Sequence, residues 1–363
     1  MNPFHVRRDK LRKLMQKAGV ESLLVTSFVN VTYLTGFTGD DSYLSLMPSG
    51  EALLSDQRYT TQLGEECPGL DLLIRSPKTN MLELVVRAIK ASKVARLGIE
   101  ADSITVGLRD RIADKLPKLS MIPISGLVES LRIVKDKEEI AAIQRAVSQA
   151  ERAFAVLRAS VRPDQTEKEL ADDLDHQMRQ FGAKRASFTP IVAVGPRAAL
   201  PHARATGKRI GEADFVLIDW GADEGLYKSD LTRVLVTGRI SPKLERVYGV
   251  VLNAQLQAIK AIRPGATCQE VDSVARGVIE KAGFGRQFGH GLGHGIGLDI
   301  HESPRLGQKQ KQPLKAGMVV TVEPGVYLPG WGGVRIEDDV LVTKSGHEVL
   351  TSVPKEWADV CIG

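Results

Sequence analysis

The second half of this 363-residue chain contains one pattern twice, and this repeat strongly limits the folds available to it. A pair of amphipathic segments precedes residues 214–236, "DFVLIDWGADEGLYKSDLTRVLV", and another pair precedes residues 317–342, "GMVVTVEPGVYLPGWGGVRIEDDVLV". Each unit has an apolar strand that ends at an acid, a glycine-containing reversal, and a return strand with a second acid. Strands that are almost wholly apolar are typical of sheets covered on both faces. We therefore expect a buried sheet with an approximate two-fold repeat.

Four helices are expected to accompany these strands. Asp136 and Glu139 form a capping-box pattern at the start of a long helix, in which apolar residues recur at steps of three and four. A short strand is expected just before that helix, near residues 127–134. The other three helices are expected at residues 166–181, 243–262 and 268–282.

The chain is expected to form two domains, residues 1–128 and 129–363. Over residues 1–126, short apolar runs alternate with helical patterns, which is typical of an α/β domain. That region has no acid–histidine cluster and no glycine-rich phosphate loop, so we expect it to shape the substrate site or to mediate oligomerisation. The chemistry is therefore expected in residues 129–363.

Composition and charge exclude several classes of function. No apolar run approaches the ~20 residues of a membrane span. The basic N-terminal segment lacks the apolar core of a signal peptide, so we expect a cytoplasmic protein with no membrane partner. The net charge is only +5 and aromatic residues make up 5% of the chain, which disfavours nucleic-acid binding. The three cysteines, Cys67, Cys268 and Cys361, form neither a disulfide framework nor a thiolate zinc pattern.

Four acids end the repeated strands, and they are Asp219, Asp230, Glu323 and Glu337. A carboxylate removed from water must be paired, hydrogen-bonded or bound to metal. Each acid taken alone could be solvated at a strand end or paired with an arginine, such as Arg233 or Arg335. Four acids in equivalent positions favour a shared role. Their combined charge matches two divalent cations, and mostly oxygen ligands favour Mn²⁺, Co²⁺ or Fe²⁺ over a thiolate-rich zinc site.

A glycine-rich segment supplies imidazoles. Residues 289–302, "GHGLGHGIGLDIHE", hold three of the seven histidines, His290, His294 and His301. Taken alone, the segment could be a flexible loop, or His290 and His294 could be core histidines with satisfied hydrogen bonds. Three histidines so close together favour a site, and one neutral imidazole would complete the ligand set begun by the four acids.

Together with "LIDWG", "YKSDLTR", "VEPGVY" and "VRIEDD", this histidine segment resembles the creatinase/prolidase/aminopeptidase P group of pita-bread metallopeptidases. The five separated motifs stand in that group's order, and the resemblance covers residues 130–355. Residues 1–126 resemble the group's smaller N-terminal domain more loosely. The resemblance implies an α+β protein in which a C-terminal pita-bread fold follows a smaller N-terminal α/β creatinase-like domain.

The resemblance also implies a dinuclear metal site. Asp219 would bind one metal ion, and His294 and Glu323 would bind the other. Asp230 and Glu337 would bridge the two. Mn²⁺ is the expected metal, with Co²⁺, Fe²⁺ or Zn²⁺ as alternatives. The glycines around His294 would let the backbone pass close to the metals and the substrate, where any Cβ would obstruct it.

Further roles follow from the same resemblance. His202, in "ALPHAR", and His301 would contact the substrate and take part in catalysis, and His290 would bind substrate. Glu323 is the expected proton shuttle, and Arg335 would orient an acid near the metals. The expected substrate is a peptide with proline at the second position, and the expected assembly is a homodimer. The remaining acids of these motifs are expected to be solvated or to lie outside the ligand set, namely Asp223, Asp299, Asp338 and Asp339.

Other functions remain open on this scaffold. A methionine aminopeptidase would share the fold, but the N-terminal domain, His290 and "VRIEDD" disfavour it. A creatinase-like hydrolase would work without metal, and a metal-free pseudoenzyme would only bind a partner. The complete set of ligand types disfavours both. Xaa-Pro aminopeptidase and Xaa-Pro dipeptidase are not separated, because they differ in how far the site is closed beyond the proline.

Removal of metal should abolish peptidase activity, because four clustered carboxylates repel one another unless cations lie between them. Addition of Mn²⁺ or Co²⁺ should restore the activity. The measurement is turnover before and after dialysis against a chelator, with elemental analysis to establish that the metal has gone. Activity that persists after complete removal would favour the metal-free hydrolase.

Overall fold

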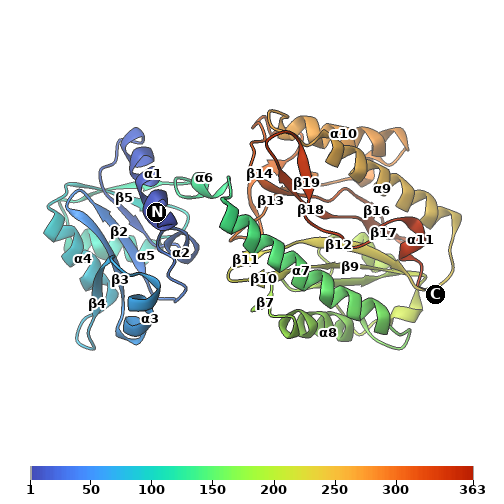
Figure 1. Cartoon of the computed structure of the whole chain (residues 1–363), viewed down its shortest axis with the longest axis horizontal. Helices are drawn as coiled ribbons and strands as arrows, with labels where there is room; N and C mark the ends of the chain where they lie inside the picture. The colour runs from blue at the N-terminus through green and yellow to red at the C-terminus, as the bar shows by residue number, and fades with distance from the viewer. Residues whose placement is uncertain (1, 363) are drawn as a thin grey trace. The chain divides into compact units, whose positions relative to one another are not determined.

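The computed structural model describes residues 2–362 and divides into two compact units, Met1–Arg132 and Ile133–Gly363 (Figure 1). The division lies between Arg132 and Ile133, whereas the sequence analysis placed the domain boundary after residue 128. Across residues 2–362, every helix is too short or too polar to cross a membrane. The three cysteines are free thiols.

The N-terminal unit is built on a six-stranded mixed sheet in the order β4-β3-β2-β1-β5-β6. Its strands are β1 (Leu23–Val25), β2 (Tyr43–Met47), β3 (Gly50–Asp56), β4 (Asp71–Arg75), β5 (Arg96–Glu100) and β6 (Ser120–Ile124). Its helices are α1 (Pro3–Lys17), α2 (Phe28–Thr35), α3 (Thr60–Glu66), α4 (Met81–Ser92), α5 (Val106–Lys115) and α6 (Glu129–Arg132). Strand β2 pairs antiparallel with β1 and β3, and the other pairs are parallel. The predicted α/β character is confirmed.

The short strand expected near residues 127–134 is wrong, because this segment forms helix α6. The Ser130 amide donates to the Gly126 carbonyl at 3.0 Å, which closes a helical turn. Arg132 is buried at the end of the helix, and its Nη1 donates to Asn30 Oδ1 at 2.9 Å. A local turn and one long-range contact thus outweigh the β-forming residues of the segment.

The C-terminal unit alternates helix pairs with groups of strands. Its long helices are α7 (Lys137–Ser160), α8 (Glu167–Gln180), α9 (Pro242–Ala261) and α10 (Cys268–Lys281), and α11 (Trp357–Val360) is short. Its first group of strands is β7 (Arg185–Ala186), β8 (Ile191–Val194), β9 (Phe215–Trp220), β10 (Ala222–Glu224), β11 (Tyr227–Lys228) and β12 (Leu231–Val236). Its second group is β13 (Gly293–Gly295), β14 (Glu302–Leu306), β15 (Val319–Val322), β16 (Gly325–Leu328), β17 (Gly332–Arg335), β18 (Asp338–Val342) and β19 (His347–Val349).

The repeat in the sequence becomes two antiparallel strand pairs. In the first half, β9 pairs with β12 inside the sheet β12-β9-β8. In the second half, β15 pairs with β18 inside the sheet β14-β13-β15-β18-β19. An isolated antiparallel bridge between Thr232 and Glu337 joins the two sheets. The two halves therefore meet at the positions where both return strands begin, next to Asp230 and Glu337.

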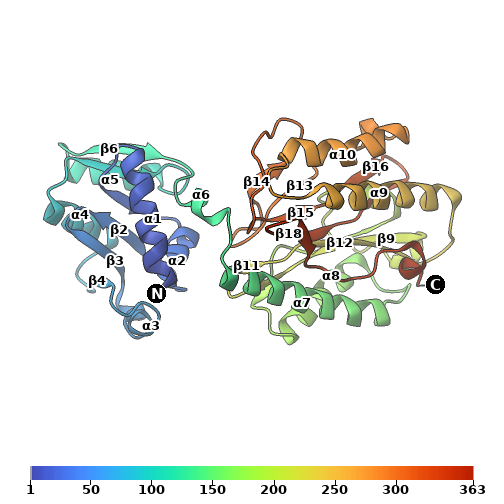
Figure 2. The same cartoon turned by 45° about the horizontal axis from the view of Figure 1, so that its top comes forward.

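The strands lie between the two helix pairs, with α7 and α8 on one side and α9 and α10 on the other (Figures 1 and 2). Alternate residues of β9 point to opposite faces of the sheet and pack in two different cores. Val216, Ile218 and Trp220 pack with the core of α7 and α8. Phe215 and Leu217 pack with the core of α9 and α10. A sheet filled on both faces is what the apolar strands predict.

Capping side chains fix where the long helices begin. Asp136 accepts the amides of Glu138 and Glu139, and the Glu139 carboxylate accepts the Asp136 amide at 3.0 Å. Equivalent capping boxes begin α8 at Thr166 and α10 at Thr267. Each box satisfies backbone donors that the first helical turn leaves free. The predicted start of the long helix α7 is confirmed.

Replacement of Trp220 should destabilise the C-terminal unit. The side chain is fully buried, its ring stacks on Phe154 with centroids 4.3 Å apart, and its Nε1 donates to the Ala150 carbonyl at 2.9 Å. Trp220→Ala should lower the free energy of unfolding by about 3–5 kcal/mol, because it leaves a cavity and removes the hydrogen bond from Nε1. Urea unfolding measures the effect. Leu200→Ala, at a side chain that is 53% exposed, is the control and should change stability by less than about 0.5 kcal/mol. An equal effect of both substitutions would contradict the packing described.

Candidate active site

The four acids of the repeat come together where the two sheets meet. Asp219 lies in β9 and Asp230 directly precedes β12, while Glu323 directly follows β15 and Glu337 directly precedes β18. Thr232 stands opposite both Asp219 and Glu337 in the strand register. Its hydroxyl donates to Glu337 Oε2 at 2.6 Å. Strand pairing thus places acids from distant parts of the sequence side by side.

His294 projects from β13 toward these acids. Its Nδ1 donates to the Gly295 carbonyl at 3.0 Å, which leaves the lone pair on Nε2. Nε2 lies 3.6 Å from Asp230 Oδ2 and 3.5 Å from Glu323 Oε1. Burial, together with the neighbouring His301, lowers the pKa of His294 to about 3. The ring is therefore neutral, and its free nitrogen faces the carboxylates as a metal ligand would.

Glycines allow β13 to pack tightly against its neighbours. A Cβ on Gly293 would lie 2.1 Å from the Thr321 carbonyl oxygen, and one on Gly291 would lie 2.6 Å from the Leu306 carbonyl oxygen. Both glycines also line the cavity, where the sequence predicts close approach of the backbone to metals and substrate. The structure adds a second reason, because the atoms that exclude a Cβ here belong to the backbone of adjacent segments.

Burial dominates the electrostatics of the acid cluster. It raises the pKa of Asp219, and it raises the pKa of Glu323 to about 8. The pKa values of Asp230 and Glu337 are raised further, because each is buried and also repelled by neighbouring carboxylates. Arg335 is the cation in contact with the cluster, and its Nη2 donates to Asp219 Oδ2 at 2.5 Å. One guanidinium can compensate only one of the four carboxylates, so ionising all four would require further cations.

The residues present fit divalent metal ions. Asp230, His294 and Glu337 each offer a ligand atom, and these atoms lie within 4.8 Å of one another. Asp219 Oδ1 is buried and has no hydrogen-bond partner among the described residues, although buried polar atoms are ordinarily paired. Carboxylate oxygens with a single imidazole nitrogen suit hard or borderline divalent cations. This donor set could hold the metal pair that the sequence predicts.

A single cavity of about 1180 Å³ brings the assigned residues together. All nine residues that the sequence analysis assigned line it, and they are His202, Asp219, Asp230, His290, His294, His301, Glu323, Arg335 and Glu337. His202 and His301 are exposed in it. The His301 ring meets the His294 ring edge to face, with centroids 4.4 Å apart. The two exposed imidazoles are thus available to a bound molecule, whereas His294 is buried.

A hydrogen-bonded chain connects His290 to the acid cluster through a residue that the sequence analysis missed. His290 Nδ1 donates to the Gly291 carbonyl at 2.7 Å, so its Nε2 accepts from the Tyr327 hydroxyl at 3.0 Å. That hydroxyl accepts from Arg335 Nη1 at 2.9 Å, and Arg335 holds Asp219. Burial lowers the pKa of His290 to about 4, so the ring is neutral. Tyr327 stands in the quoted "VEPGVY", which was the available signal.

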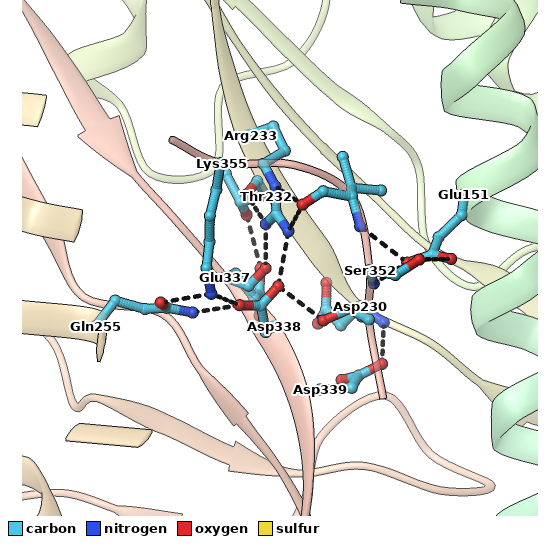
Figure 3. A network of polar contacts seen from close by, with 12 residues as sticks. Glu151, Asp230, Thr232, Arg233, Gln255, Glu337, Asp338, Asp339, Ser352 and Lys355 are labelled. Carbon is cyan, nitrogen blue, oxygen red and sulfur yellow. Dashed lines mark hydrogen bonds and ion pairs between the residues drawn. The ribbon is translucent and has the colours of Figure 1, made fainter. Parts of the chain in front are cut away.

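Two acids outside the proposed ligand set, Asp338 and Asp339, form hydrogen bonds that hold the backbone of that set in place. Asp338 and Asp339 are 1% and 0% exposed, so of the two positions expected for them the structure shows the one outside the ligand set and not the solvated one. Asp339 Oδ2 accepts the Asp230 amide at 3.0 Å (Figure 3). Arg233 does not pair with the four acids, because its Nη2 donates to Asp338 Oδ1 at 2.7 Å and its Nη1 to the Glu337 carbonyl at 2.6 Å. These contacts fix the backbone of Asp230 and Glu337.

The C-terminal segment completes that support. Asp338 also accepts from Gln255 at 2.6 Å, from Thr351 at 2.7 Å and from Lys355 (Figure 3). Burial opposes ionisation, but Arg233 and Lys355 outweigh it and hold the pKa of Asp338 well below its usual value. Asp223 is likewise fully buried, with Arg185 and Lys228 as its ion partners, so it too lies outside the ligand set and not in solvent.

An oxygen-rich ligand set in a cavity open to solvent, on a duplicated helix–strand fold, is the arrangement of a metal-dependent hydrolase. A sequence profile of metallopeptidase family M24 matches residues 141–344, and one of the creatinase/prolidase N-terminal domain matches residues 7–134. The chain belongs to metallopeptidase family M24. The predicted resemblance and fold class are confirmed.

Relatives match along almost the whole chain. An Xaa-Pro dipeptidase of Pyrococcus furiosus is 36% identical over 96% of this chain and 99% of that protein. The structure of an Xaa-Pro dipeptidase from Bacillus anthracis is 37% identical, with a TM-score of 0.93 over 97% of this chain and 99% of that one. The structure of an X-Pro aminopeptidase from Thermotoga maritima is 35% identical, with a TM-score of 0.88 over 95% and 99%.

Loss of His294 and loss of His301 should have different consequences. His294→Ala should lower metal content, because a buried nitrogen that faces the acids disappears. His301→Ala should keep its metal and lose about 10²–10³-fold in turnover, as expected for a contact made to the reacting group. His202→Ala should resemble His301→Ala. Elemental analysis paired with kinetics distinguishes the two results. Equal metal loss in the His294 and His301 variants would show that their roles are wrongly assigned.

Proposed function

We propose that this protein is a metal-dependent peptidase that hydrolyses the peptide bond between an N-terminal residue and a proline at the second position. The observation that carries the proposal is the shared cavity, in which the ligand atoms of Asp230, His294 and Glu337 lie together with exposed imidazoles. The names of the relatives support the substrate class. Two of them are named Xaa-Pro dipeptidases and one is named an X-Pro aminopeptidase.

The metal ligands are assigned as the family resemblance implies. Asp219 would hold one cation, His294 and Glu323 would hold a second, and Asp230 and Glu337 would contribute to both. The cations would be Mn²⁺, with Co²⁺, Fe²⁺ or Zn²⁺ as substitutes. When bound, they supply Lewis acidity and compensate the charge of the cluster. The unpartnered Oδ1 of Asp219 and the free Nε2 of His294 support this assignment.

The protein's own residues position the substrate and move the proton. Glu323 faces the cavity beside His294, where it can take a proton from the attacking water and return it to the leaving nitrogen. His301 and His202 reach the carbonyl region of the scissile bond from the exposed side. Arg335 holds Asp219 in place, and Tyr327 ties Arg335 to His290.

The cavity also offers apolar walls for a proline ring. Phe188, Ile191, Phe288 and Ile300 line it together with the polar residues. A prolyl bond has no N–H to donate and the ring fixes φ, so shape and apolar contact can recognise it where a hydrogen bond cannot. His290 contributes to this wall, since its ring packs edge to face against Phe288 with centroids 5.2 Å apart.

We further propose that the protein acts in the cytoplasm as a homodimer. The resemblance to the family supports these two assignments. Among the described residues, the N-terminal unit contributes none of those that line the cavity described above. Its proposed role is therefore to shape access to the site or to mediate assembly.

The substrate proposal is tested with matched peptides in Mn²⁺. An Xaa-Pro dipeptide and an Xaa-Pro-Xaa tripeptide are compared with the same peptides carrying alanine in place of proline, and with a methionine-initiated peptide lacking proline. Proline peptides should be cleaved at least about tenfold faster, because a site built for the ring gains nothing from alanine. Turnover of the tripeptide marks an aminopeptidase, and turnover of the dipeptide alone marks a dipeptidase. Preference for the methionine peptide, or no cleavage of either proline peptide, would refute the proposal.

A further inference from the structure

Residues 288–292 form the loop that carries His290, and its backbone is anchored at Leu292, whose carbonyl accepts the Glu323 amide at 2.8 Å. Gly289 and Gly291 flank the histidine, and glycine loses more backbone freedom on ordering than any other residue. A Cβ on Gly289 would meet nothing within 4 Å, so packing does not confine that position. The His290 ring is bound at Tyr327, but that contact does not fix the loop backbone. The restraint on residues 288–290 must come from another element.

An ion pair on α10 supplies that restraint. Asp272 and Arg276 stand one helical turn apart, and Arg276 Nε and Nη2 donate to the two Asp272 oxygens at 2.9 Å each. Asp272 is fully buried, and the Arg276 side chain is 12% exposed. The pair is bidentate and shielded from water, which makes it stronger and more rigid than a surface pair.

The same two side chains hold the loop backbone at three points. Arg276 Nη1 donates to the Phe288 carbonyl at 3.0 Å, and Nη2 donates to the His290 carbonyl at 2.9 Å. Asp272 Oδ1 accepts the Leu292 amide at 3.1 Å. The guanidinium also lies over the Phe288 ring, 4.2 Å from its centroid. The loop is thereby held at its start, at its middle and at its end.

We propose that the Asp272–Arg276 pair is the positioning device of this loop and sets where the His290 ring stands in the cavity. The proposal rests on the proposed function, in which His290 meets the substrate. Arg276 uses four N–H groups in one plane, two for Asp272 and two for backbone carbonyls. A lysine has one nitrogen and cannot span these partners, so charge alone does not meet the requirement. Arg276 and Asp272 are positioning residues, because they act through His290.

The test is a double-mutant cycle between Arg276 and His290. Arg276→Lys keeps the positive charge and should lower kcat/KM for an Xaa-Pro peptide at least about tenfold, since small displacements of substrate-positioning groups are costly. In the His290→Ala background the same change should lower kcat/KM by less than about threefold, because the residue through which it acts is gone. Metal content by elemental analysis should stay at the wild-type level in all variants.

Hydrogen–deuterium exchange of residues 288–292 gives a readout independent of activity. Arg276→Lys should speed exchange there and leave α7 and α8 unchanged. Asp272→Asn, which keeps one oxygen for the Leu292 amide, should act in the same direction with a smaller effect. Lys168→Met breaks an exposed ion pair with Asp172, also one turn apart, on α8. This control should leave both loop exchange and kcat/KM within about twofold of wild type.

Two outcomes would overturn the proposal. An equal loss of kcat/KM in both backgrounds would mean that Arg276 does not act through His290. A loss of activity with unchanged loop exchange would mean that Arg276, which also lines the cavity, contacts the substrate directly. Failure of the proposed function is recognised separately, because wild-type protein would then cleave no Xaa-Pro peptide while the exchange measurement still reports on the loop.

Discussion

Asp219, Asp230, Glu323 and Glu337 occupy one largely buried space, in which neighbouring carboxylates raise the cost of ionising Asp230 and Glu337. The rest of the C-terminal unit is arranged so that these groups stay together. The strands of both halves present the acids from opposite sides, and Thr232 stands at the junction in register with two of them. Arg335 supplies charge on one side. The neutral His294 supplies a lone pair on another.

Rigid support explains why the acids can be held so close. Asp339 binds the backbone of Asp230, and Asp338 is fixed by Arg233 and by the segment that carries Lys355 (Figure 3). Arg233 and Lys355 thus lie on the side of the strands away from the cavity. The four carboxylates of the cluster line the cavity. Removing one partner from such a buried network leaves an uncompensated charge, which is more costly than losing a surface pair.

Local signals in the sequence predicted much of this structure. The capping box at Asp136 and the apolar strands ending at Asp219 and Glu323 follow from residue type and spacing alone. Tyr327 and the burial of Asp338 could not be predicted in this way, because each depends on partners far away in the sequence. Helix α6 was not predicted for the same reason, since Arg132 at its end forms a hydrogen bond with the distant residue Asn30. Sequence spacing indicates which residues lie at the end of a strand. Their burial and their contact partners are known only once the three-dimensional fold is known.

The bridge between Thr232 and Glu337 joins residues that are 105 positions apart. During synthesis the first half of the repeat therefore leaves the ribosome with Asp219 and Asp230 but without the strand that faces them. A complete pocket for cations exists only after the second half has been made and has docked. With the ligands proposed above, metal capture would follow translation of both halves, and an interrupted chain would carry only part of the ligand set.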